Sequence, residues 1–204
     1  MSKLENIQEE LSKKQLNQHF IFNTLNTIKC NTIIDKKQAC RLIDDFAKYL
    51  RYNFNALEKK EAVAFREEIE QVKVYLELEM ARFSQIKAEY ELEEENFFLP
   101  PMCLQPLVEA ALVYGLCPKE QGGTIVIRSF QEELDYVIEI NDNGVGLGTE
   151  NGEEEKTRLQ TIEEIRYCLE ELMDGTLQLE SEPEKGTWIT IRIPVNNARK
   201  REFQ

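Results

Sequence analysis

The chain has 204 residues, of which 42% are hydrophobic and 31% charged, a composition typical of a folded globular protein. Its formal net charge of −13 repels a phosphate backbone, so we expect a protein partner or a small ligand and no nucleic acid. Five cysteines without a CxxC pair indicate free thiols in a reducing, cytoplasmic compartment. No segment approaches the roughly 20 apolar residues that span a bilayer, although the chain is compatible with the cytoplasmic part of a longer membrane protein.

The first region predicts a long helix, because residues 4–31 contain neither proline nor glycine and their apolar residues recur at heptad spacing. The apolar heptad positions are Leu4, Ile7, Leu11, Ile21, Leu25 and Ile28. Two polar residues, Lys14 and Gln18, interrupt the series, and the only histidine, His19, follows them. We expect His19 beside the seam, near a partner helix and within reach of solvent. It is either an ordinary helical histidine or a group that changes charge near neutral pH.

A second helix is expected after Asp35, because an aspartate carboxylate is a favourable N-cap. Its apolar face comprises Ala39, Leu42, Ile43, Phe46, Ala47, Leu50 and Phe54. Two helices joined by a short polar turn form an antiparallel hairpin with an uncovered apolar stripe. Pairing of two hairpins into a dimeric four-helix bundle would cover that stripe, so we expect a homodimer.

The rest of the chain alternates helical and strand patterns after a charged linker at residues 58–61. The expected elements are helices at 66–83, 103–115 and 158–173 and strands at 87–93, 124–130, 134–140, 176–182 and 187–194. A glycine-rich, acidic stretch at 145–155 predicts a mobile loop, and the residues after Val195 predict a frayed polar tail. This order predicts an α/β sandwich in which helices cover a mixed sheet, so the fold class is α+β.

Asp142 lies just after the expected strand 134–140, and Gly144 and Gly146 follow it. A carboxylate at a strand end can accept a hydrogen bond from an amino group such as that of adenine, and the glycines leave room for a ring. The alternative is a turn in which Asp142 hydrogen-bonds to its own backbone. A dinucleotide fingerprint is excluded because Thr149 stands at the third glycine position. A calcium loop is excluded because glycines stand at ligand positions.

Glu109 is the one acid in the apolar helical segment Leu104-Gln105-Pro106-Leu107-Val108-Glu109-Ala110-Ala111. A glutamate in such a segment is commonly a surface residue. The functional alternative directs Glu109 into a ligand pocket under the sheet. Both alternatives are open at this point.

Several blocks in one order and spacing resemble the LytS-type sensor histidine kinases over about residues 10–195. The blocks are His19–Asn26, Tyr49–Tyr52, Tyr75–Glu79 with Arg82-Phe83, Leu104–Glu109, Asp142–Gly146 and Lys185–Thr187. One block alone would be weak, whereas the ordered set is specific. In that family a dimeric helical hairpin carries a phosphoacceptor histidine, and an α/β domain related to the GHKL ATPases binds Mg-ATP.

The resemblance implies a dimerisation and phosphoacceptor hairpin at 1–58, an ATP-binding-like GHKL sandwich at 59–197 and a tail at 198–204. It implies two catalytic residues, His19 as the phosphoacceptor and Glu109 near the phosphates, where it would activate the histidine or water. The implied cofactor-binding residues are Asp142, which would contact adenine, and Gly144, Gly146 and Thr187. The phosphoryl group would pass from His19 to an aspartate of a response regulator, and positioning and charge neutralisation would drive the transfer.

The chain departs from the family pattern at the phosphate side of the site. Ala110, Val113 and Tyr114 replace an Asn, a Lys and a His of the motif, and that Asn places Mg²⁺ on the phosphates. The glycine-rich lid aligns with residues 156–161, which contain no glycine, and Gln18 replaces the proline before the histidine. We therefore expect weakened ATP binding, no metal ligand, and impaired ATP-dependent phosphorylation of His19.

Two cations of the lid segment, Lys156 and Arg158, are candidates to neutralise phosphate charge without a metal. Two flexible cations do not reproduce an oriented Mg²⁺, so we do not expect them to restore the activity. The alternative function is a pseudokinase that dimerises and regulates a partner histidine kinase or response regulator without turning over ATP. A third hypothesis is a sensor that binds adenine through Asp142 and Gly146 without hydrolysis.

Overall fold

The computed structural model describes residues 7, 18–56, 61–147 and 152–199. Its elements are α2 (Gln18–Ile34), α3 (Lys36–Ala56), β1 (Val63–Ala64), α4 (Phe65–Met80), β2 (Ile86–Leu92), β3 (Phe98–Leu99), α5 (Leu104–Ala110), η1 (Ala111–Leu116), β4 (Gly123–Glu132), β5 (Asp135–Asp142), α6 (Gly152–Met173), β6 (Thr176–Glu182), β7 (Gly186–Pro194) and α7 (Val195–Ala198). No helix in the described ranges is long and apolar enough to cross a membrane.

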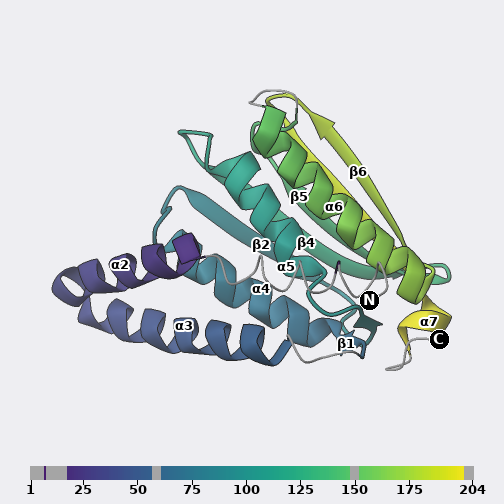
Figure 1. Cartoon of the computed structure of the whole chain (residues 1–204), viewed down its shortest axis with the longest axis horizontal. Helices are drawn as coiled ribbons and strands as arrows, with labels where there is room; N and C mark the ends of the chain where they lie inside the picture. The colour runs from purple at the N-terminus through teal and green to yellow at the C-terminus, as the bar shows by residue number, and fades with distance from the viewer. Residues whose placement is uncertain (1–6, 8–17, 57–60, 148–151, 200–204) are drawn as a thin grey trace.

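The two N-terminal helices, α2 and α3, form the expected antiparallel hairpin, which packs on α4 through α3 (Figure 1). Asp35 caps α3 as predicted, because its Oδ1 accepts the backbone N–H groups of Lys37 at 2.9 Å and Gln38 at 3.0 Å. These bonds satisfy amides that have no partner inside the helix, and they stabilise the start of α3.

The buried stripe of α2 coincides with the predicted heptad seam only in part. Phe20, Thr24 and Ile28 are buried, whereas Leu25 is 47% exposed. Phe20 inserts its ring between α3 and α4, and with this orientation Ile21 packs against the core while Leu25 faces solvent. The predicted seam residues Leu4, Leu11 and Lys14 lie outside the described residues.

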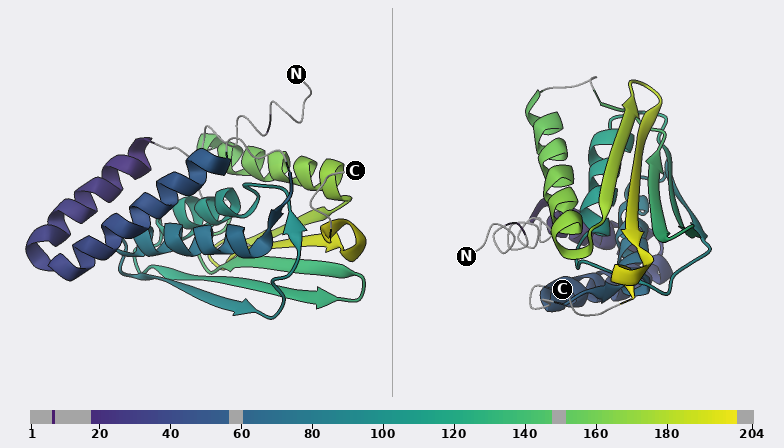
Figure 2. Two further views of the ribbon diagram at one scale, coloured as in Figure 1. Left: turned by 90° about the horizontal axis from the view of Figure 1, so that it is seen from below. Right: turned by 90° about the vertical axis from the view of Figure 1, so that its right-hand side faces the viewer.

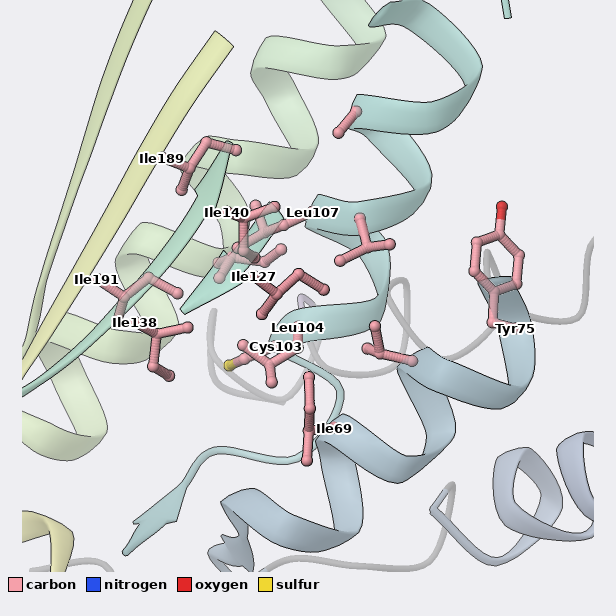
Figure 3. Packing of buried hydrophobic residues seen from close by; sticks show 14 of the residues in the cluster. Ile69, Tyr75, Cys103, Leu104, Leu107, Ile127, Ile138, Ile140, Ile189 and Ile191 are labelled. Atoms are coloured by element: carbon pink, nitrogen blue, oxygen red, sulfur yellow. The ribbon is translucent and has the colours of Figure 1, made fainter. Parts of the chain in front are cut away.

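The rest of the chain is the predicted two-layer sandwich. Its five-stranded sheet has the order β2-β4-β5-β7-β6, with β2 and β4 parallel and the other neighbours antiparallel. Helices α4, α5 and α6 cover one face of this sheet (Figures 1 and 2). Isoleucines of the central strands meet leucines of α5 between the layers, as Figure 3 shows. A small sheet pairs β1 with β3.

Two predicted boundaries of this sandwich are wrong. The expected loop 145–155 is too long, because α6 already begins at Gly152; acidic residues follow that glycine, and acids are favoured in the first turn of a helix. The tail after Val195 is not frayed along its described part. It forms α7, in which Ala198 is fully buried, so Ala198 belongs to the core and not to a tail. Residues 200–204 lie outside the described ranges.

The predicted helix 103–115 is present but changes its winding. It runs as α5 to Ala110 and continues as the π-helical segment η1. Such segments are rare and are frequently found at functional sites. Here the change occurs at the residue that follows Glu109 and Ala110, the two positions at which the sequence predicts phosphate-side chemistry.

Candidate functional site

His19 lies on the exposed first turn of α2, next to a residue that anchors the helix. The ring of Phe20 is 4.8 Å from that of Tyr49 on α3 and 5.3 Å from that of Tyr75 on α4, measured between centroids. The side-chain nitrogen of Asn23, one turn later, lies 3.1 Å from Nδ1 and 3.2 Å from Nε2 of His19. The aromatic cluster therefore sets the position of the helix start, while the imidazole itself is accessible as predicted.

A cavity of about 520 Å³ opens beside His19 at the junction of α2, α4, α5, η1 and α6. His19 and Glu109 both line it, although they are far apart in the sequence. Ala110 also lines it, and so do Glu79 and Arg82 at the end of α4. The structure thus brings the two predicted catalytic residues to one cavity, together with the alanine that replaces the metal-binding asparagine.

The walls of this cavity are mostly apolar and contain two carboxylates. Burial raises the pKa of Glu79, and the Arg82 guanidinium, 3.4 Å away, opposes this shift only in part. Burial, followed by the charges of Glu109 and Glu79, raises the pKa of Tyr75 well above its usual range. The phenol of Tyr75 therefore stays neutral at physiological pH and can act as a hydrogen-bond donor.

Asp142, Gly144, Gly146 and Thr187 form a second cluster, at the end of β5 and the start of β7. Asp142 and Thr187 are direct partners in the β5–β7 register, and both are buried. Asp142 Oδ1 accepts the Gly144 N–H at 2.9 Å, so the turn predicted as an alternative is present. None of these four residues lines the cavity beside His19. The predicted site is therefore two clusters in the structure.

The glycines around Asp142 permit close packing of backbones. A Cβ on Gly115, at the end of η1, would come within 2.8 Å of Asp142 Oδ1, and one on Gly144 would come within 2.2 Å of the Gly115 carbonyl oxygen. Gly146 has φ +73°, a left-handed conformation that favours glycine. These contacts hold η1 against the end of β5. Gly115 and Gly144 thus enclose the Asp142 carboxylate in a close-fitting pocket, which we call the cradle.

Arg158 on α6 enters this cradle, which corrects the expectation of a flexible cation. Its side chain is 1% exposed, with Nη2 3.5 Å from Asp142 Oδ2 and within 2.7 Å of Thr187 Oγ1, to which it donates. Lys156, two residues earlier, is exposed as expected. The physical reason is helical phase. Arg158 lies on the same face of α6 as the core residues Ile162 and Ile165, so it points into the protein.

Burial disfavours the charged forms of both Asp142 and Arg158. It raises the pKa of Asp142, and the Gly144 N–H and the Arg158 guanidinium oppose that shift. It also lowers the pKa of Arg158, and Asp142 and Glu155 oppose that shift. Each ion therefore depends on its partner to remain charged inside the protein. The sequence contained one indication of this buried ion pair, because Arg158 stands at a position of α6 where the helical pattern expects an apolar residue.

The position at which the family pattern has a magnesium-binding asparagine is occupied by Ala110. Ala110 is buried and offers a methyl group where the family pattern has an amide oxygen. Among the described residues, no group of three or more His, Cys, Asp or Glu side chains is arranged to hold a metal. The position of Ala110 therefore contributes no ligand to a metal-dependent step.

Sequence profiles of two families match consecutive parts of the chain. The histidine kinase profile covers residues 7–86, and the profile of the histidine kinase-, DNA gyrase B- and HSP90-like ATPases covers residues 102–197. The fold agrees with this match. The catalytic domain of the histidine kinase ThkA superposes with a TM-score of 0.51 at 15% identity, over 67% of this chain and 96% of that domain. At this identity the likeness concerns the fold alone.

Curated relatives agree with the profiles. The protein YwpD of Bacillus subtilis is 31% identical over 188 residues, which are 89% of this chain and 68% of YwpD. Sensor histidine kinase YpdA of Escherichia coli is 33% identical over 72% of this chain and 27% of its own length. Sensor protein LytS of Bacillus anthracis is 30% identical over 88% of this chain and 33% of its own length. The chain thus spans a third or less of the two sensor proteins.

Proposed function

The chain belongs to the LytS-type histidine kinases of two-component signalling, as its sequence blocks predicted. On this premise we propose that His19 is a phosphoacceptor and that another protein supplies its phosphoryl group. A partner histidine kinase would donate the phosphoryl group, and an aspartate of a response regulator would receive it. The chain's own ATP-dependent phosphorylation of His19 would be impaired. ATP binding is a property of the family, and its weakening here is part of the proposal.

The observation that carries this proposal is that Ala110 and His19 line the same cavity. Next to the acceptor imidazole, the position that would hold a metal on the phosphates is a methyl group. Phosphoryl transfer from a nucleotide relies on a metal ion and oriented donors to neutralise charge, and the methyl group of Ala110 offers no ligand to such an ion. The accessible imidazole keeps the acceptor function without that machinery.

A dimeric hairpin at residues 1–58, followed by the sandwich at 59–197, is part of the same proposal. The hairpin carries large apolar residues that the described part of the chain leaves exposed: Phe22, Leu25, Ile43 and Phe54 are between 47% and 64% exposed. A second hairpin would cover them in a four-helix bundle. The partner would be another copy of the chain or a related kinase.

The second candidate function is an active ATP-dependent kinase, which Glu109 favours because it lines the cavity with His19. In that case Glu109 would accept a proton from the imidazole during transfer. The pseudokinase alternative differs in one respect, because it requires no phosphorylation of His19 from any donor.

One experiment separates these functions. The purified chain is incubated with Mg-ATP or with phosphoramidate, whose P–N bond breaks as a new bond forms between phosphorus and an imidazole nitrogen and ammonia leaves. We expect acid-labile phosphate from phosphoramidate and a far smaller amount from ATP. Because His19 is the only histidine, His19→Gln should remove the label entirely. Efficient labelling by ATP would contradict the proposal, and no labelling by either donor would leave the pseudokinase.

A further inference from the structure

The Arg158 guanidinium lies at the strand end that the family resemblance assigns to adenine. It reaches Asp142 from α6, at 3.5 Å, and donates to the Thr187 hydroxyl at 2.7 Å. Both acceptors are residues that the sequence assigned to the nucleotide. The arginine is 1% exposed, and Asp142 is equally shielded. An ion pair so enclosed is part of the packed interior.

A guanidinium can satisfy the same acceptors as the amino edge of adenine. Both are flat and conjugated, and both present N–H donors in their plane to a carboxylate. The guanidinium has the further advantage of a positive charge, which a neutral base lacks. A carboxylate as buried as Asp142 is more stable opposite a cation than opposite a neutral amino group.

The cradle around Asp142 has no room for both the Arg158 side chain and a nucleobase. Gly115 and Gly144 are in backbone contact there, and even a methyl group on either would clash. A base could approach the carboxylate only after Arg158 had left. Its departure would break a buried ion pair, and the separated ions are strongly disfavoured inside a protein.

One atom of Arg158 is not matched by the surrounding pocket. The buried Nε has no hydrogen-bond partner within the part of the chain that the structure describes. Buried donors are nearly always paired, so an unpaired one marks a fit that is incomplete. A single terminal nitrogen, Nη2, donates to the Thr187 hydroxyl and forms the ion pair with Asp142, whereas Nε is not matched.

We propose that Arg158 is a built-in occupant of the base subsite, so that the folded chain does not take adenine nucleotides at Asp142. The side chain contributes the donors that a nucleobase would provide, and it holds the start of α6 on the sheet. This inference concerns the base alone and does not depend on whether His19 accepts a phosphoryl group. Loss of the metal ligand and occupation of the base subsite are separate changes in the same nucleotide site.

The test uses adenosine, which contains the base and no phosphates. The wild-type chain, labelled with ¹⁵N, is titrated with adenosine to millimolar concentration while the amide signal of Gly144 is followed. We expect no saturable shift. Arg158→Ala should show a saturable shift at concentrations about an order of magnitude below the highest one at which the wild type shows none, since the buried pair no longer has to be broken.

Two controls make the test specific. Lys156→Ala removes an exposed charge from the same helix and should behave as the wild type. The double variant Arg158→Ala with Asp142→Asn should lose the adenosine response, because the carboxylate that receives the amino group is absent. Methylguanidinium should raise the melting temperature of Arg158→Ala and leave that of the wild type unchanged, since it refills the vacated position.

Each outcome decides the proposal. A saturable shift of Gly144 in the wild type, with an affinity within a few-fold of that of Arg158→Ala, would overturn it, and so would a folded Arg158→Ala that responds to neither probe. If Arg158→Ala does not fold by itself, recovery of the fold with methylguanidinium supports the proposal. If it does not recover, the wild-type titration alone decides, because it needs no variant.

Discussion

Tyr52 on α3 donates a 2.5 Å hydrogen bond to Glu68 on α4, and the same buried carboxylate accepts the backbone N–H of Met102 at 2.9 Å and that of Leu104 at 3.3 Å. One carboxylate thus joins the hairpin to the start of α5. Gln105 adds a second link, because its side-chain amide donates to the Tyr49 hydroxyl at 3.1 Å. Since α5 ends at Ala110, these contacts set the position of the cavity relative to His19.

Removal of the Tyr52 hydroxyl should therefore loosen the hairpin from the sandwich. Tyr52→Phe leaves Glu68 with one donor fewer, and we expect the free energy of unfolding to fall by about 1–2 kcal/mol. Urea denaturation measures the loss. Arg51→Ala, an exposed neighbour on the same helix, is the control and should change stability by less than about 0.5 kcal/mol. Equal effects of the two variants would show that the hydrogen bond between Tyr52 and Glu68 does not contribute to stability.

Phe20 should hold the helix turn that carries His19. Its ring is buried between Tyr49 and Tyr75, so Phe20→Ala should cost about 3 kcal/mol of stability or release the start of α2 from α3 and α4. Amide hydrogen exchange along α2 distinguishes these results. Lys29→Ala, at an exposed polar position of the same helix outside the apolar stripe, is the control and should leave the exchange of α2 unchanged.

Glu79 should make stability fall as the pH rises. Burial raises the pKa of its carboxyl in the folded chain, so the folded state holds its proton above the pH at which the unfolded chain releases it. The stabilisation is fully present below the usual glutamate pKa and is lost as the pH rises through the raised value. Glu79→Gln should thus gain stability relative to the wild type as the pH rises above the usual glutamate pKa, which urea denaturation measures. Glu77→Gln, exposed on the same helix, should show no such trend.

The exposed stripe of the hairpin should control the oligomeric state. Leu25→Glu and Ile43→Glu place charges where the proposed partner hairpin would pack, and we expect a shift from dimer to monomer in sedimentation velocity. Leu134→Glu changes a leucine that is 81% exposed in the turn between β4 and β5, so it should leave the state unchanged. A wild-type chain that is monomeric at high micromolar concentration would remove the dimer from the proposal.

Restoring the metal ligand by itself should not restore ATP-dependent phosphorylation. Ala110→Asn returns an amide oxygen to the cavity, but Arg158 still occupies Asp142. We expect His19 labelling from Mg-ATP to stay near the wild-type amount in Ala110→Asn and to rise, if modestly, in Ala110→Asn with Arg158→Ala. Strong labelling in the single variant would show that the arginine is no obstacle to the nucleotide.

Local patterns predicted most of the fold. The order of helices and strands, the α/β sandwich and the Asp35 cap all agree with the structure, because periodicity and capping depend on residues close in sequence. The predicted boundaries at residues 152 and 198 were wrong for different reasons. The acidic residues after Gly152 are a local signal for a helix start that the prediction did not use, whereas the burial of Ala198 depends on neighbours far along the chain.

The sequence by itself determined the family and the candidate residues, because ordered blocks such as His19–Asn26 and Asp142–Gly146 are properties of the chain alone. Only the tertiary structure decided which of them meet. It placed His19 and Glu109 on one cavity and Asp142 in another cluster, beneath Arg158. The physical reason is that an arginine on an apolar helix face needs a buried anion opposite it, and only the packing of α6 on the sheet determines which anion that is.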